Sequence, residues 1–305
     1  MTYEILKKSD VNEIVQIAKE VLIHDIIDED IFIEKSFEDP YYDPELCWVA
    51  KENNEIVGFI VGGYRDYEKG KFGYIKLIGV APEFQRKKVA SNLLQKVEEK
   101  VKAMGATELK MMDIPLNYFM PGLDPRYTEC FVFLLKNGFN KVGENHNMHV
   151  DFEENDFSTA AQEKVLTKEG FEIKRADKAD FEGVMEFVRP IWKLWEYEIE
   201  QSYKNNPITL HIAKFQGKVV AFSMHSGNNK GLPWFGPMGT DPSLRGKKMG
   251  EILLKRCLAD QKAVGFNYSI IPWVGPTAFY LKTVNAKVAR VFWTMSKPLV
   301  NKEGK

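Results

Sequence analysis

Two short basic segments of this chain, 160 residues apart, have similar sequences. "APEFQRKKVASNLL" occupies residues 81–94, "TDPSLRGKKMGEILL" occupies residues 240–254, and the two align without gaps. The matching pairs are Pro82 with Pro242, Gln85 with Arg245, Lys87-Lys88 with Lys247-Lys248, Ala90 with Gly250, and Leu93-Leu94 with Leu253-Leu254. A chain of 305 residues is long enough to bury two ordinary cores, so the repeat predicts two copies of one domain.

The flanks of the two basic segments are also alike. "EIVGFIVGG" (55–63) and "KVVAFSMHS" (218–226) are apolar, β-branched runs that follow turn-like residues, which predicts hairpins. Each half reads as a strand, one or two helices, a strand pair, a further strand, the basic segment, a long helix, a strand, a second helix and a closing strand. This order predicts an α/β (α+β) fold with a mixed sheet in each domain. We expect domains at 1–152 and 169–305, joined by a polar linker at 153–168.

Composition excludes several classes of protein. The formal net charge is −1, which argues against a general nucleic-acid binder, because such a protein presents a basic domain. The three cysteines, Cys47, Cys130 and Cys257, are scattered without ligand spacing, so we expect them in the core and expect no metal. The chain shows no signal-peptide or membrane-span pattern, so we expect a cytoplasmic protein that binds no membrane. Its oligomeric state is not predicted.

The basic segments lie where a strand gives way to a helix. A helix start presents N–H groups without partners and the positive end of the helix dipole. Gly246 and Gly250 let a bulky anion approach the main chain, and the lysines add positive charge. The segment therefore predicts a pyrophosphate-binding loop, although a charged, solvated turn is the alternative.

The strand–loop–helix order resembles the acetyl-CoA-binding motif of the GNAT acyltransferase superfamily, Gln/Arg-x-x-Gly-x-Gly/Ala. It stands here as Arg245-x-x-Lys248-x-Gly250 and as Gln85-x-x-Lys88-x-Ala90. The resemblance covers both halves and implies a tandem GNAT protein that uses acetyl-CoA as co-substrate. The cofactor-binding residues that it implies are Met238, Gly239, Thr240, Arg245, Gly246, Lys247, Lys248, Met249, Gly250 and Phe279 in the second half, and Val80, Gln85, Arg86, Lys87, Lys88, Val89 and Ala90 in the first.

Both copies carry lysine where the motif has its first glycine. A main-chain N–H donates whatever the side chain is, so Lys248 can serve if its φ is negative. At positive φ a lysine would be strained and binding would be in doubt. We expect retained binding, with the ammonium group near a phosphate.

The resemblance also implies where the chemistry occurs. The strand before the loop, 75–80 or 234–240, would splay from its neighbour to admit the pantetheine, although an ordinary edge strand is equally compatible. Tyr280 follows Phe279 on the implied helix and would protonate the departing thiolate; a packed aromatic is the alternative. The first half has Leu134 at the matching position, so we expect it to be a degenerate copy.

The base and the acceptor site are less constrained by the sequence. Glu196 and Glu198 would relay a proton or attract a cationic amine, although charges on a solvated helix face are typical. Trp195, Tyr197 and Trp273 would bind the substrate; core packing is the alternative. We expect structural roles for His211 and His225. The loop 113–127 would line a site or pack on the surface.

Taken whole, the chain resembles bacterial tandem-GNAT proteins that include glucosamine/glucosaminide N-acetyltransferases. The resemblance implies an acetyl-CoA-dependent N-acetyltransferase in which a small primary amine attacks the thioester directly, with glucosamine as the leading acceptor. A mycothiol-synthase-like or other small-amine acetyltransferase is an alternative, as is a FemX-type aminoacyl transferase. An alternative of another class is a CoA-binding sensor without turnover.

Overall fold

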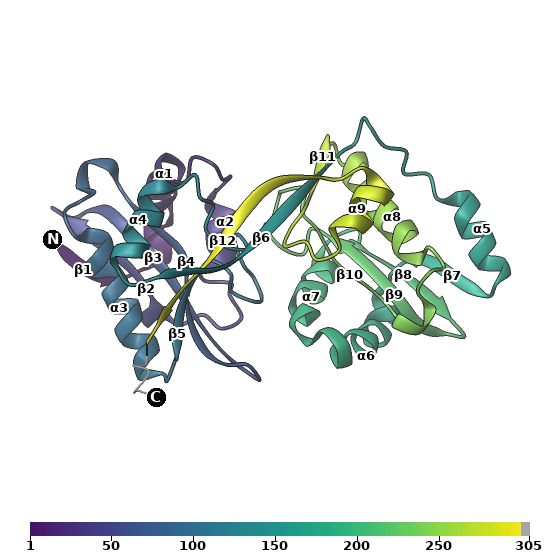
Figure 1. Ribbon diagram of the computed structural model, residues 1–305, viewed down its shortest axis with the longest axis horizontal. Helices are drawn as coiled ribbons and strands as arrows, with labels where there is room; N and C mark the ends of the chain where they lie inside the picture. The colour runs from purple at the N-terminus through teal and green to yellow at the C-terminus, as the bar shows by residue number, and fades with distance from the viewer. Residues whose placement is uncertain (300–305) are drawn as a thin grey trace. The chain divides into compact units, whose positions relative to one another are not determined.

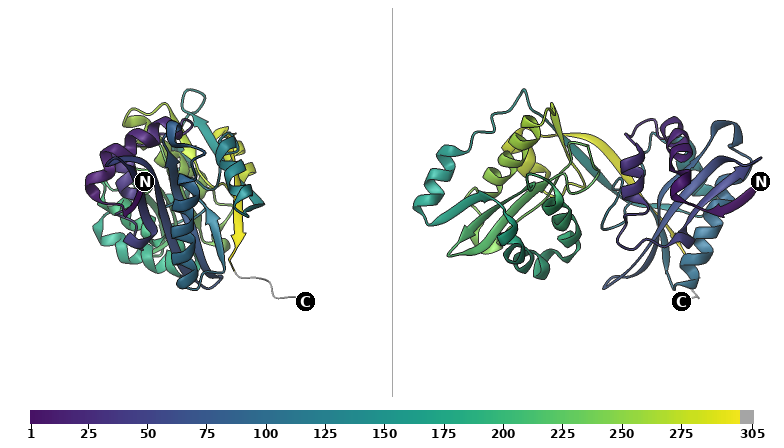
Figure 2. Two further views of the ribbon diagram at one scale, coloured as in Figure 1. Left: turned by 90° about the vertical axis from the view of Figure 1, so that its left-hand side faces the viewer. Right: turned by 180° about the vertical axis from the view of Figure 1, so that it is seen from behind.

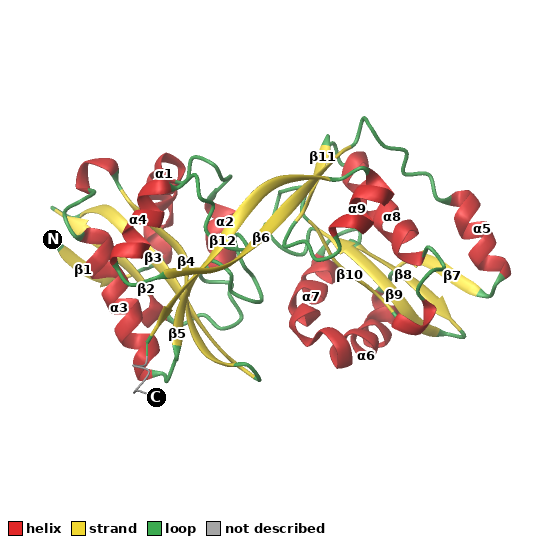
Figure 3. Ribbon diagram, in the orientation of Figure 1, coloured by secondary structure: helices red, strands yellow, loops and turns green. Residues whose placement is uncertain are grey.

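The computed structural model describes residues 1–299 (Figure 1). It divides into two compact units, Met1–Asn145 together with Val291–Lys305, and His146–Arg290. Each unit contains one copy of the basic segment and a sheet with helices packed against it (Figure 3). The helices of the described part are too short or too polar to span a membrane.

The first unit is built on strands in the order β1-β2-β3-β4-β5-β12. Its strands are β1 (Thr2–Ile5), β2 (Cys47–Glu52), β3 (Glu55–Tyr67), β4 (Gly70–Val80), β5 (Glu108–Met111) and the C-terminal part of β12 (Lys287–Pro298). Its helices are α1 (Val11–Val21), α2 (Glu29–Lys35), α3 (Val89–Ala103) and α4 (Thr128–Lys136). The predicted hairpin is confirmed, since β2 and β3 pair antiparallel. Helices α1 and α2 cover one face of the sheet and α3 covers the other (Figures 1 and 2).

The second unit repeats this plan with strands in the order β10-β9-β8-β7. Its strands are β7 (Phe171–Arg175), β8 (Leu210–Phe215), β9 (Lys218–His225), β10 (Phe235–Thr240) and β11 (Tyr268–Ile271). Its helices are α5 (Ala160–Lys168), α6 (Phe181–Trp192), α7 (Glu196–Lys204), α8 (Met249–Ala263) and α9 (Thr277–Val284). Helices α6 and α7 bury apolar side chains of β8 and β9 on one face, and α8 buries those of the other.

The two copies exchange their last strands. The C-terminal part of β6 (Asn140–Asp151), which belongs to the first copy, pairs with β11 from Tyr268↔Asp151 to Ile271↔Met148. Strand β12 of the second copy pairs with β5 from Met295↔Met111 to Pro298↔Glu108. The units therefore differ from the expected contiguous domains 1–152 and 169–305, because the sequence division assumed that each copy keeps its own closing strand.

The expected linker 153–168 contains a helix that belongs to the second unit. Leu166 of α5 is 3% exposed and packs with Phe171 and Met249. Polar side chains on the outer face of a short amphipathic helix account for the linker-like sequence.

Candidate functional site

The two basic segments adopt the same backbone course. In the second unit β10 ends at Thr240, Arg245 is extended, Gly246 has a φ of +88°, and α8 begins at Met249. In the first unit Gln85 is extended, Arg86 has a φ of +60°, and α3 begins at Val89. A glycine and an arginine thus adopt one left-handed turn, so the shape of the loop is conserved between copies whose sequences differ.

The lysine at the position of the first motif glycine is also left-handed in both copies. Lys248 has φ +63° and ψ +10°, and Lys88 has φ +66° and ψ +7°. The condition for an unstrained lysine at this position, a negative φ, is therefore not met at Lys248: the chain enters the helix through a turn for which glycine is the unstrained residue. The lysines cost about 1–2 kcal/mol each in folding free energy.

The N-terminal amides of α3 and α8 are open to an anion. In the described part of the chain neither N-cap lysine side chain makes a capping hydrogen bond. The first helical amides that donate to the cap residues are those of Asn92, to Lys88 O, and Ile252, to Lys248 O. The amides before them face outward at the positive end of the helix dipole, which suits a phosphate.

The predicted cofactor residues of the second unit come together at this loop. A Cβ on Gly250 would lie 3.2 Å from Met238 Cε and 3.7 Å from both Phe279 Cζ and Thr240 Oγ1. The end of β10, the first turn of α8 and the start of α9 thus meet at one small residue. Gly239 faces the other side of the sheet, where a Cβ would lie 2.7 Å from the Trp192 ring.

The cations of the loops take different partners. Lys247 Nζ lies 2.6 Å from Glu169 Oε2, whereas Lys87 Nζ lies 4.9 Å above the Phe84 ring. Lys88 and Lys248 are exposed, and so are Arg86 and Arg245. Gln85 Nε2 donates to Val80 O at 3.1 Å and so fixes the loop to the end of β4.

The strand before each loop diverges from its parallel neighbour. Strands β4 and β5 pair from Phe72↔Glu108 to Ile75↔Met111, after which β4 continues alone beside β3. In the second unit, within residues 1–299, an isolated parallel β-bridge between Trp234 and Ile270 stands in place of a ladder between β10 and β11. Main-chain groups of 76–79 and 235–240 on that side are therefore open, as a pantetheine-binding strand requires.

Tyr280 lies in the apolar core of the second unit. It is 6% exposed and packs edge-on against Phe235 and Phe279, with ring centroids 6.2 and 5.1 Å away. Burial raises its pKa, so the phenol is protonated at neutral pH and is a weaker acid than usual. Leu134 of the first unit is also buried, which fits a core position in both copies. The role of Tyr280 as an acid stays a prediction.

The predicted base and acceptor residues lie on and near α7. Glu196 accepts from Arg189 Nε at 3.1 Å, whereas Glu198 is 6% exposed. Trp195 stacks on Trp192 with ring centroids 5.2 Å apart and packs against the core between α6, α7 and the sheet. This position fits the alternative of core packing. Tyr197 is half-buried in the first turn of α7.

Trp273 follows β11 and itself has a left-handed backbone conformation, with a φ of +47°. It is half-buried, and its main-chain N–H donates to Asn147 Oδ1 at 3.0 Å. It stands in the second unit where Asp113 stands in the first, at the same offset of 160 as the basic segments.

The two histidines that were expected to be structural share one carboxylate. His211 Nε2 lies 2.7 Å from Asp260 Oδ2, and His225 Nε2 lies 3.4 Å from the same oxygen. Burial would raise the pKa of Asp260, but hydrogen bonds from His211, His225 and Arg175 hold it well below its usual range. The cluster joins β7, β8, β9 and α8.

The loop 113–127 is buried rather than exposed. Arg65 of β3 donates to Pro115 O at 3.0 Å and to Asp39 at 2.8 Å, and Lys35 Nζ donates to Asn117 Oδ1 at 2.9 Å. Sequence reasoning missed these buried charges. A signal existed for Lys76 alone, since this lysine interrupts the apolar run "YIKLIGV" and is 1% exposed.

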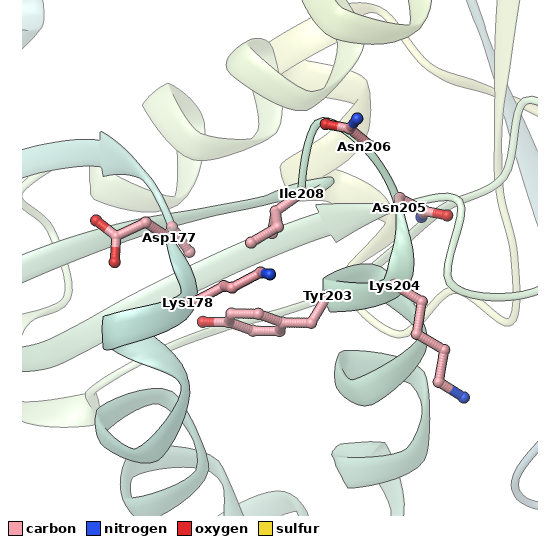
Figure 4. A pocket seen from close by; sticks show the side chains of 8 residues that line it. Asp177, Lys178, Tyr203, Lys204, Asn205, Asn206 and Ile208 are labelled. Atoms are coloured by element: carbon pink, nitrogen blue, oxygen red, sulfur yellow. The ribbon is translucent and has the colours of Figure 1, made fainter.

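A separate hollow of about 540 Å³ lies between the end of β7 and the end of α7 (Figure 4). Its lining residues are Ala176, Asp177, Lys178, Tyr203, Lys204, Asn205, Asn206 and Ile208. None of these belongs to the predicted site, and the hollow is lined by side chains of mixed charge.

Known proteins resemble the chain in sequence over part of its length. The acetyltransferase (GNAT) family matches residues 12–117, which lie in the first unit. An acetyltransferase of Yersinia enterocolitica is 31% identical over 113 residues, 37% of this chain and 75% of that protein. One of Pectobacterium atrosepticum is 38% identical over 71 residues, which cover 23% of this chain and only 48% of that protein.

Solved structures resemble the chain over nearly its whole length. The glucosamine N-acetyltransferase region of a fungal multi-domain β-N-acetylglucosaminidase superposes with a TM-score of 0.80 at 18% identity, covering 97% of this chain and 38% of that one. A tandem GNAT protein from the clavulanic acid biosynthesis pathway superposes with a TM-score of 0.69 at 12% identity, covering 99% of both chains. At these identities the likeness shows the fold. With its two copies of the loop and of the splayed strand, the chain belongs to the GNAT family of acetyltransferases.

Proposed function

We propose that the protein is an acetyl-CoA-dependent N-acetyltransferase that acts on a small primary amine, with an amino sugar such as glucosamine as the leading acceptor. One observation carries the proposal: in each unit an uncapped helix N-terminus with a basic, left-handed loop follows a strand that leaves its parallel neighbour. This combination offers donors for a pyrophosphate and open main-chain groups for a pantetheine.

In the second unit the cofactor would lie across the end of β10. The amides from Gly246 to Gly250 would bind the pyrophosphate, and the exposed Lys248 would add charge that salt screens. Met238, Thr240 and Phe279 lie close around Gly250, so a larger residue there would take space from the loop.

The reaction exchanges one bond for another. The acceptor nitrogen, as a free amine, attacks the thioester carbonyl carbon; the C–N bond forms, the C–S bond breaks, and the thiolate leaves and takes up a proton. The nitrogen loses one proton as it becomes an amide, and this proton returns to the group that protonated the thiolate. Tyr280 is the proposed donor of that proton, and Glu196 or Glu198 is the proposed attraction for the cationic amine. Trp195, Tyr197 and Trp273 would provide the walls of the acceptor site.

Two observations support an amino sugar as the acceptor. The fungal region named above is described as a glucosamine N-acetyltransferase, and this chain shares its fold over 97% of the residues. Aromatic side chains beside carboxylates on α7 suit a polar, cationic ring.

The direct test is thiol release from acetyl-CoA with a panel of amines that contains glucosamine, an aromatic amine and a cysteinyl amine. We expect release that depends on both substrates, with glucosamine the best acceptor. Release with another amine only would refute the amino sugar. Tight acetyl-CoA binding without release for any amine would identify a sensor instead.

A further inference from the structure

A buried carboxyl group lies at the mouth of the β4–β5 divergence in the first unit, and nothing described above uses it. Asp113, the second residue after β5, is 7% exposed. Its Oδ1 is buried and has no hydrogen-bond partner within residues 1–299. A hydrogen bond from its own main-chain N–H serves the carboxyl group, but a buried carboxylate oxygen without a partner is costly, so its presence requires a reason beyond packing.

The backbone brings Asp113 to the apex of the divergence. The last contact between the two strand lines is the hydrogen bond from Met112 N to Ile75 O, at 2.8 Å. Met112 has a φ of +68°, and tight-turn hydrogen bonds join Asp113 N to Met111 O and Ile114 N to Met112 O, at 2.9 and 2.7 Å. A strained turn therefore ends β5 where a thioester inserted between the strands would end.

The surroundings of Asp113 favour a proton acceptor. Burial raises its pKa to about 6, while the charge of Lys110 lowers it and that of Glu108 raises it. From β4 the charged or titratable group that interacts with Asp113 is Tyr74. At neutral pH the group is a carboxylate of more than ordinary basicity, which suits a general base.

The second copy lacks this group and has another. Trp273 occupies the position of Asp113, whereas Leu134 occupies in the first copy the position of Tyr280. The first unit is therefore not a reduced version of the second, because each copy carries an ionisable group that the other lacks.

We propose that the first unit is a second acyl-transfer site, in which Asp113 takes the proton from the acceptor amine. This inference rests on the proposed acetyltransferase function. The acceptor ammonium gives one proton to the Asp113 carboxylate, and the free amine attacks the thioester carbonyl. The C–N bond forms, the C–S bond breaks, the nitrogen gives a second proton to the thiolate, and Asp113 returns its proton to water. The site would take cationic primary amines.

The test separates the two units by matched charge reversals of exposed lysines in the full-length chain. Lys247→Glu with Lys248→Glu impairs the acetyl-CoA loop of the second unit, and Lys87→Glu with Lys88→Glu impairs that of the first. Thiol release is measured with acetyl-CoA and the best amine of the panel, and acetyl-CoA binding by calorimetry. We expect turnover to persist in the second-unit variant and to fall about 10²- to 10⁴-fold when Asp113→Asn is added.

The pH profile distinguishes a base from a structural residue. In the second-unit variant, kcat/KM should rise with pH through about 6, following the pKa of Asp113, and Asp113→Asn should remove that limb without changing acetyl-CoA affinity. Asp66→Asn, an exposed carboxylate on β3 of the same unit, is the control and should change the rate less than threefold.

Three outcomes would overturn the inference. Turnover within threefold after Asp113→Asn in the second-unit variant would remove the role of Asp113. Complete inactivity of the second-unit variant beside full activity of the first-unit variant would remove the first-unit site but leave the proposed function intact. Absence of thiol release by the unaltered chain with every amine would refute both together.

Discussion

The buried carboxyl group of Asp113 should make the free energy of unfolding depend on pH. Burial raises its pKa from 3.8 to about 6, so the folded chain holds this proton more tightly than the unfolded chain does. Stability therefore falls as pH rises from about 4 to 6, which is the direction for a raised carboxyl pKa. The shift of 6 − 3.8 = 2.2 units, at about 1.4 kcal/mol per unit, amounts to about 3 kcal/mol.

The measurement compares Asp113→Asn with the unaltered chain by urea unfolding, followed by tryptophan fluorescence, at pH 4 and pH 7. The amide cannot ionise, so the difference in unfolding free energy between the two proteins should shift by about 2 kcal/mol in favour of the variant between these pH values, because at pH 4 the carboxyl group of the unfolded chain is already partly ionised. Using the shift cancels contributions that do not depend on pH, such as the burial of the amide itself. Asp66→Asn is the control, since Asp66 is exposed on β3 of the same unit.

A shift close to zero, equal to that of Asp66→Asn, would refute the reasoning. It would mean that Asp113 ionises as freely as a surface group, and the argument for a base at this position would lose its electrostatic support.

Three other perturbations test the loops, the phenol and the histidine cluster. Lys248→Gly relieves a residue at φ +63°, so a thermal melt should show unchanged or higher stability, while calorimetry should show acetyl-CoA affinity lower by about 1 kcal/mol, less at high salt. Tyr280→Phe keeps the ring in its core, so the melting temperature should hold while kcat falls about 10²- to 10⁴-fold; an unchanged kcat would leave the residue a packed aromatic. Asp260→Ala leaves His211 and Arg175 without their shared carboxylate and should lower stability by about 3 kcal/mol in urea unfolding at pH 7. In the unaltered chain that contribution should disappear in acid, because the pKa of Asp260 is lowered in the fold; equal stability of both proteins at pH 7 would contradict this.

The features that local sequence controls were predictable. Hairpins at β2–β3 and β8–β9 follow from β-branched runs after turn residues, and the helices after the basic segments follow from their apolar spacing. The duplication made each identification stronger, since two imperfect copies agreed on the same order of elements.

The backbone of the loop was not predictable in detail. Lysine has no preference for positive φ, so nothing in the letters of Lys88 or Lys248 reveals a left-handed residue. The conformation is imposed by the entry into the helix, and the pattern of the family, with glycine at this position, was the better guide.

The position of buried charge is only partly readable from sequence patterns, for a similar reason. Asp113 follows a strand in which charged and apolar residues alternate, as a surface residue does, and only the course of the strained turn at Met112 places it inside. Lys76 is the extra residue of a bulge, between the pairs Val61↔Leu77 and Gly62↔Ile75, which period-two counting cannot locate.

The exchange of closing strands determines where the chain can be divided without exposing a sheet edge. The two copies follow one another in the sequence. The second unit, however, is one continuous segment, residues 146–290, that is inserted between the two segments of the first unit. Cutting between the copies, near residue 160, would leave β5 without its neighbour β12 and would expose a bare sheet edge prone to aggregation. A deletion that removes residues 146–290 and joins Asn145 to Val291 would keep the part of β12 that pairs with β5 in the first unit. The boundary between the two sequence repeats is therefore not the boundary at which the folded units can be separated.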